Sequence, residues 1–145
     1  MFQFENIEWF ICSKPESAVN KITGKQLTKD ELNQVVFDKK QEFVSLSFPL
    51  NDNLLFYVNR EYKTPINVRQ LFTIIYKFYK EPLEESNIES AFLEMEGLLE
   101  EWEEYHEGDL SKLTKYDVFT DTCTPDFCGL EFGDDGSHYV LIGPE

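Results

Sequence analysis

Residues 67–80 read NVRQLFTIIYKFYK and predict the central helix of the protein. Wound as an α-helix, this stretch carries apolar side chains around most of its circumference. Its polar residues recur at spacings of four, four and three, which places them in one narrow stripe: Arg69, Thr73, Lys77 and Lys80. Asn67 stands at the position of a helix cap, and Gln70 is placed to complete a capping box with it. The sequence predicts a central, mostly buried helix over residues 68–80 with one thin basic edge.

Sequences on both sides of this helix predict β-hairpins. Apolar residues alternate with serine over residues 43–48, and the Asn-Asp-Asn sequence at 51–53 favours a turn into a second strand at 54–58. Residues 128–143 read CGLEFGDDGSHYVLIG, in which a DDG turn separates two alternating runs. The residues expected to form the apolar side of this second hairpin are Leu130, Phe132, Tyr139 and Leu141.

The N-terminal part of the chain predicts shorter elements. Residues 1–12 alternate weakly, which favours an edge strand or a short strand pair, and residues 14–26 have the composition of a loop. Thr28 and Glu31 have the spacing of a capping box. The residues after it present one apolar face and predict a helix over residues 29–38: Leu32, Val35 and Val36.

Together these elements predict a single α+β domain spanning residues 1–145. We expect an antiparallel sheet, built from the two hairpins and the N-terminal strand and covered on one face by two or three helices. Hydrophobic residues make up 41% of the chain and aromatic residues 15%, which is enough to fill a core and argues against a disordered protein. No run approaches the roughly 20 apolar residues of a membrane span, so we expect no membrane association.

The formal net charge of −15 is unevenly distributed along the chain. Residues 81–109, here called the acidic stretch, hold twelve acidic residues and no basic ones, whereas the remaining residues hold 16 acidic and 13 basic ones. Phosphate backbones and anionic membranes are bound by clustered Lys and Arg. The charge therefore argues against direct nucleic-acid binding and favours a basic protein as the partner.

The acidic stretch also has a helical apolar pattern. Its largely apolar seam repeats at spacings of four, three, four, three and four: Ile88, Phe92, Met95, Leu99, Trp102 and His106. Residues 88–107 therefore predict an amphipathic helix at the periphery of the domain, with an apolar inner face and a carboxylate outer face. The acidic residues that lie off the seam form the predicted docking face: Glu94, Glu96, Glu100, Glu101, Glu103, Glu104 and Glu107.

Other functions fit the same distribution of charge. An acidic inhibitor or immunity-type protein that mimics nucleic acid would spread its acids over one broad face. Further aspartates would then continue the acidic face of the helix: Asp117, Asp121, Asp126 and Asp134. Apolar residues of the seam that stay exposed would instead mark the interface of a homodimer. A further alternative is that the acids only keep the protein soluble.

Catalytic and metal-binding signals are weak in this sequence. Cys123 and Cys128 do not have the usual spacing of paired zinc ligands, so with His138 they are weak candidate ligands, and we expect no metal and no other cofactor. Nearby acids raise the pKa of a thiol, which disfavours a Cys128 nucleophile beside His138. A small enzyme of that kind would show a deep pocket around one of these two side chains. We therefore expect a non-enzymatic protein.

The cysteine content and the start of the chain favour an intracellular protein of the cytoplasm or the nucleus, and we expect the cytoplasm. Three cysteines leave at least one without a partner in the same chain, which favours a reducing compartment. The first residues carry Glu5 and Glu8 among apolar side chains and lack the basic region of a secretory signal.

Two motifs of this sequence resemble a family of uncharacterised paralogous proteins of mimivirus-type giant DNA viruses, which is related to a fungal domain of unknown function. The first motif is TPINVRQLFTIIYKFY followed by EPL, residues 64–79 and 81–83. The second is TPDFCGLEFGDDGSHYVLIGPE, residues 124–145, in which Cys128 stands where the family pattern has an aromatic or acidic residue. The resemblance implies a viral protein, acting in the infected cell or as a structural component of the virion, and it implies no activity.

Overall fold

A computed structural model describes residues 4–11, 13–49, 57–82, 114 and 126–143 of the chain. The α+β class predicted from the sequence is confirmed, because strands and helices form separate segments around one apolar core. The predicted acidic helix and the Asn-Asp-Asn turn at 51–53 lie outside the described residues. So do all seven residues of the predicted docking face: Glu94, Glu96, Glu100, Glu101, Glu103, Glu104 and Glu107.

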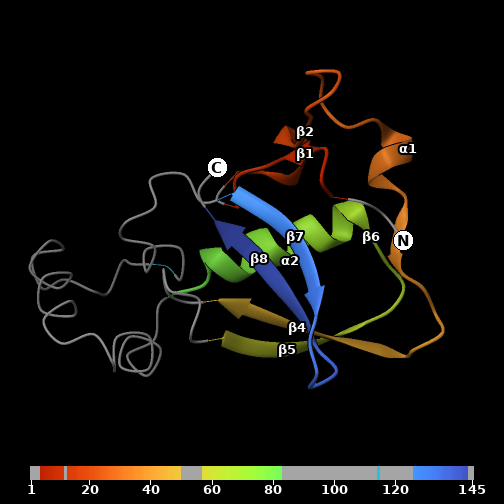
Figure 1. Cartoon of the computed structure of the whole chain (residues 1–145), viewed down its shortest axis with the longest axis vertical. Helices are drawn as coiled ribbons and strands as arrows, with labels where there is room; N and C mark the ends of the chain where they lie inside the picture. The colour runs from red at the N-terminus through yellow and green to blue at the C-terminus, as the bar shows by residue number, and fades with distance from the viewer. Residues whose placement is uncertain (1–3, 12, 50–56, 83–113, 115–125, 144–145) are drawn as a thin grey trace, which may run out of the picture.

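A four-stranded sheet is the centre of the fold (Figure 1). Its strands are β4 (Phe43–Pro49), β5 (Tyr57–Lys63), β7 (Asp126–Phe132) and β8 (His138–Gly143), in the spatial order β5-β4-β8-β7. Both predicted strand pairs are present and antiparallel, although β5 continues beyond the predicted end at residue 58. The two pairs join through β4 and β8, which run parallel.

Helix α2 (Val68–Lys80) confirms the prediction made from residues 67–80. The backbone N–H of Gln70 donates to Asn67 Oδ1 and the backbone N–H of Asn67 donates to Gln70 Oε1, each at 2.8 Å, so the predicted capping box is formed. The predicted stripe faces outward: Arg69, Lys77 and Lys80 are exposed and Thr73 is half-buried. The buried face of α2 consists of Val68, Leu71, Phe72, Ile75, Phe78 and Tyr79.

Stacked aromatic rings hold α2 on the rest of the fold. Phe78 stacks on Phe48 of β4 with ring centroids 4.1 Å apart, and Phe72 stacks on Trp9 at 4.5 Å. The hydroxyl of Tyr79 is buried and donates to the carbonyl of Pro49 at 2.8 Å, so this polar atom keeps a partner inside the core. Large aromatic side chains of this kind dominate the energetics of a small core.

The N-terminal strand does not belong to the four-stranded sheet, which corrects the prediction. β1 (Ile7–Glu8) pairs with β2 (Val19–Asn20) in a separate two-stranded sheet, and a 3₁₀ turn, η1 (Pro15–Ser17), lies between them in the chain. The segment after β1 contacts the large sheet. The Phe127 N–H donates a hydrogen bond of 2.9 Å to the Trp9 carbonyl, next to an isolated bridge between Phe10 and Asp126. β1, β2 and α1 gather at the end of the molecule away from β5 (Figure 1).

The predicted helix over residues 29–38 is much shorter in the structure. The Thr28–Glu31 capping box forms as predicted, but α1 covers only Lys29–Leu32. β3 (Val35–Phe37) follows and pairs with β6 (Ile66–Asn67) just before α2. Two valines and a phenylalanine favour a strand when a partner strand is present, so tertiary pairing overrides the helical spacing of the apolar residues.

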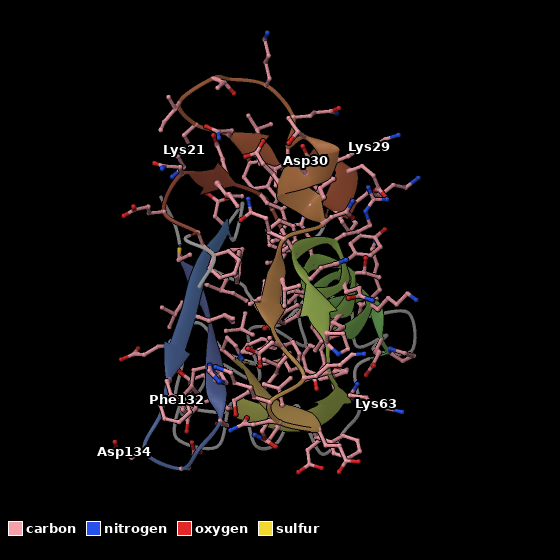
Figure 2. All side chains as sticks on the ribbon, turned by 90° about the vertical axis from the view of Figure 1, so that its right-hand side faces the viewer. Lys21, Lys29, Asp30, Lys63, Phe132 and Asp134 are labelled. Atoms are coloured by element: carbon pink, nitrogen blue, oxygen red, sulfur yellow. The ribbon has the colours of Figure 1, made fainter. Side chains whose placement is uncertain are left out.

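A β-bulge changes which side chains of the C-terminal hairpin face the core. The register of β7 and β8 shifts between Phe127 and Gly129, and Gly129 has a φ of 126°. The extra residue brings Phe127 onto the core side, opposite Ile142. Phe132, expected on the apolar side, is instead 68% exposed near the tip of the hairpin (Figure 2).

Candidate functional site

The described residues show how the segment that contains most of the acidic stretch is attached to the fold. Pro82, just after α2, forms an antiparallel bridge with Thr114. The two ends of the segment 83–113 are therefore tied to one place, at the C-terminal end of α2. Glu81, the first acid of the stretch, accepts hydrogen bonds from both guanidinium nitrogens of Arg60, with Nη2 at 2.7 Å from Oε1.

Asp126 bears on the alternative of a nucleic-acid mimic. Its side chain is only 4% exposed, so it does not contribute to an open acidic face. Asp134 is exposed at the tip of the C-terminal hairpin (Figure 2), and Asp117 and Asp121 lie outside the described residues. The broad acidic face expected for that function gains no support from Asp126.

Cys128 and His138 are not brought together by the hairpin. His138 of β8 pairs with Phe132 of β7, and Cys128 precedes Phe132 by four residues in β7. At about 3.3 Å per residue, the separation along the strand is about 13 Å. Cys123 lies outside the described residues. Among the residues that the structure describes, no three His, Cys, Asp or Glu side chains are grouped so that they could hold a metal ion.

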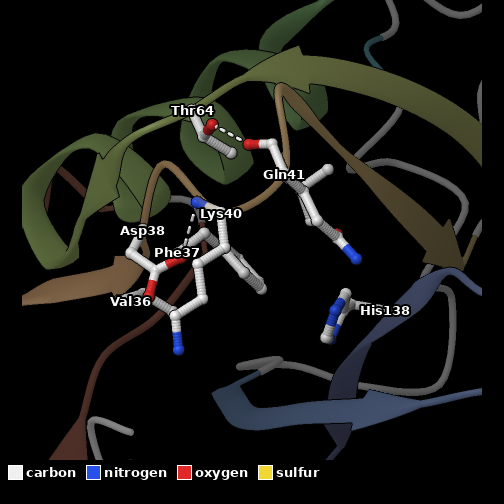
Figure 3. A pocket seen from close by; sticks show the side chains of 8 residues that line it. Val36, Phe37, Asp38, Lys40, Gln41, Thr64 and His138 are labelled. Atoms are coloured by element: carbon white, nitrogen blue, oxygen red, sulfur yellow. Dashed lines mark hydrogen bonds between the residues drawn. The ribbon is translucent and has the colours of Figure 1, made fainter.

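His138 lines a small pocket of about 270 Å³ (Figure 3). Its ring lies edge-on to Phe37, with centroids 4.7 Å apart, and 5.0 Å from the ring of Phe132. Partial burial lowers the pKa of His138 below its usual value of 6.5, which favours the neutral imidazole. The pocket is lined by Val36, Phe37, Asp38, Lys40, Gln41, Val44, Thr64 and His138.

A longer hollow, here called the α2–β5 groove, runs between helix α2 and strand β5. It consists of two adjoining pockets of about 330 and 430 Å³, which share Tyr62 and Ile74 as their floor. One pocket continues with Lys63, Pro65, Ile66, Arg69, Gln70 and Thr73. The other continues with Arg60, Glu61, Lys77, Phe78 and Glu81.

The charge of the α2–β5 groove is opposite in sign to that of the whole protein. Within the described residues, Lys63, Arg69 and Lys77 have no carboxylate within ion-pair distance. Arg60 differs, since its hydrogen bonds to Glu81 raise the pKa of its guanidinium and neutralise its charge locally. Lys63 projects from the end of β5 (Figure 2). The groove thus has Tyr62 and Ile74 as its floor and a rim with three cations that have no ion-pair partner in the part of the chain that the structure describes.

The sequence predicted the α2 wall of this groove but not the β5 wall. The spacing of polar residues in 67–80 predicted the basic edge of α2, which supplies Arg69 and Lys77. Nothing local in the sequence shows that Tyr62 and Lys63 of β5 lie opposite that edge. The pairing of β5 with β4, and of β4 with the helix through Phe48, brings them there.

The comparisons with known proteins identify no relative. No family model, no curated protein and no solved structure matches this chain. The resemblance to giant-virus proteins therefore stays a prediction. Among the described residues, no helix is long and apolar enough to cross a membrane.

Proposed function

We propose that this protein is a non-enzymatic interaction protein that binds a basic protein partner through the acidic stretch. The observation that carries the proposal is the separation of charge along the chain: residues 81–109 hold twelve acids and no bases, while the other residues hold 16 acids and 13 bases. Concentrated charge of one sign accelerates association with a partner of opposite charge and selects against others.

The position of the acidic stretch in the fold supports the proposal. The stretch starts where α2 ends, and the bridge between Pro82 and Thr114 ties both ends of segment 83–113 to the described fold. The described residues to which it is tied belong to a fold with one apolar core. We place the protein in the cytoplasm of a cell infected by a giant virus, which follows from its cysteine content and from the sequence resemblance.

The experiment that tests the proposal is capture of partners from a native or infected lysate at about 50 and 200 mM salt, a range over which screening weakens an exposed electrostatic interface. The test variant changes the seven docking-face glutamates to glutamine. A matched control removes seven other carboxylates and reaches the same net charge: Glu5, Glu8, Glu16, Asp30, Glu42, Glu131 and Asp134.

A basic protein that is captured by the wild type and the control but not by the test variant supports the proposal. The same partners with all three proteins would show that the acidic stretch has no docking role. Loss of the partner with both variants would assign binding to net charge rather than to the stretch, and would also overturn the proposal.

A further inference from the structure

The α2–β5 groove is suited to an acidic segment with apolar side chains. Tyr62 and Ile74 form its floor, and Lys63, Arg69 and Lys77 line its rim without a carboxylate partner among the described residues. An acidic partner would place carboxylates against these cations and apolar side chains on the floor. The groove is a local region of positive charge on a protein with a net charge of −15.

We propose that the occupant of this groove is the acidic stretch of a second copy of the protein. The inference rests on the proposed function, because it makes the basic groove of a second copy a binding site for the acidic stretch. The acidic stretch has the required chemistry, because a seam of apolar residues and an excess of carboxylates occur in the same twenty residues, 88–107. The two charges are complementary across the pair of copies.

The spacing of the charges agrees with this pairing. Arg69 and Lys77 lie eight residues apart on α2, which separates them by about 12 Å along the helix axis. On the helix that the sequence predicts for residues 88–107, Glu96 and Glu104 have the same separation. Carboxylates of the stretch can therefore face both cations of the groove at once.

Reciprocal exchange between two copies occupies both grooves and both acidic stretches. Each copy contributes one groove and one acidic stretch, so two copies related by a two-fold axis form two identical contacts and close the assembly. The contact also places acids of one copy against cations of the other, which offsets the repulsion between two molecules of charge −15 each. Reciprocal exchange of this kind gives a closed dimer and not an open chain of copies.

The test measures the mass of the full chain in solution by light scattering during gel filtration. One variant reverses the groove, Arg69→Glu with Lys77→Glu, and another reverses the stretch, Glu96→Lys with Glu104→Lys. The control, Lys25→Glu with Lys39→Glu, makes the same charge change as the groove variant at exposed lysines outside the groove. Far-UV circular dichroism verifies that every variant is folded.

We expect twice the monomer mass for the wild type and the control, and the monomer mass for each of the two reversed variants alone. An equimolar mixture of the reversed variants should recover the doubled mass, because each acidic surface then meets a basic one. A mixture that stays monomeric would overturn the inference, since a mere loss of structure or of charge balance cannot be rescued in this way.

A wild-type monomer would also overturn it, including the case in which the stretch binds the groove of its own copy. If that monomer still captures a basic protein through the docking-face glutamates, only this inference fails and the proposed function stands. A dimer that is indifferent to the reversal of Arg69 and Lys77 would place the interface elsewhere and reject the groove.

Discussion

Ser47 and Ser137, 90 residues apart in the chain, are hydrogen-bonded through their Oγ atoms at 3.0 Å, and both are buried. Ser137 Oγ also donates to Asp135 Oδ1 at 2.9 Å, which uses its single proton, so Ser47 is the donor between the two serines. Asn59 Nδ2 in turn donates to Ser47 Oγ at 2.9 Å. This polar chain crosses from β5 to the β7–β8 turn and joins the two hairpins where β4 and β8 run parallel.

Replacing Ser137 by alanine should therefore weaken the junction between the hairpins. The Ser47 hydroxyl loses its acceptor inside the protein, and an unsatisfied buried polar group costs about 1–3 kcal/mol. Urea denaturation should show this fall in the free energy of unfolding. The double variant with Ser47→Ala should lose less than the sum of the single variants. Additivity within about 0.5 kcal/mol would show that the two side chains are not coupled.

Local signals in the sequence predicted the local features of the fold. The capping boxes at Thr28 and Asn67 formed as expected, because a cap needs only the side chain and backbone of adjacent residues. The alternation in residues 43–48 placed β4 correctly for the same reason. The parallel pairing of β4 with β8 was not predicted, since it joins residues about 90 positions apart and depends on side chains such as Ser137.

The Asn67 cap gives a second prediction. Asn67→Ala removes the acceptor for the first-turn N–H of Gln70 and should lower the free energy of unfolding by about 0.5–2 kcal/mol. Asn67→Asp keeps an acceptor at the same place and should retain most of the stability. Thermal unfolding followed by circular dichroism measures both. Equal losses for the two variants would mean that the amide has a role other than capping.

The stacked pair of Trp9 and Phe72 gives a third prediction. Trp9 is 2% exposed and bridges the N-terminal segment to α2, so Trp9→Ala should lower the free energy of unfolding by about 3–5 kcal/mol. The matched control is Phe132→Ala, which removes an aromatic ring that is 68% exposed and contacts the ring of His138. It should cost no more than about 1.5 kcal/mol, the upper value for an aromatic pair. Urea denaturation compares them. A small loss for Trp9→Ala would show that the N-terminal segment contributes little to the core.

The candidate sites were less predictable than the fold, because each is formed by residues distant in the chain. His138 was recognised from the sequence, but its neighbour Phe37 was predicted to be helical and lies instead on β3. The β-bulge at Cys128 was not predicted, and the register of the hairpin separates that thiol from His138. The residues that line a pocket depend on strand register and on pairing between distant segments. Neither can be read from the residues of one segment.

His138 gives the last prediction, a dependence of stability on pH. Partial burial against Phe37 and Phe132 lowers the pKa of the folded imidazole below the value of about 6.5 expected in the unfolded chain. Between these two pKa values the unfolded chain binds a proton that the folded protein does not bind. Stability should therefore be full above pH 6.5 and should fall as the pH decreases toward the pKa of the folded state.

The measurement is urea denaturation at pH 7.5 and 5.5 for the wild type and His138→Gln. The wild type should lose more stability than the variant, because glutamine does not titrate. Asp38 and Lys40 also line the pocket, but both are present in the two proteins. Asp135, whose pKa is lowered chiefly by its hydrogen bond from Tyr139, loses its contribution only when the pH falls below 3.8, its usual value, and lies outside this window. An equal loss in both proteins would show that burial of the imidazole does not govern this dependence.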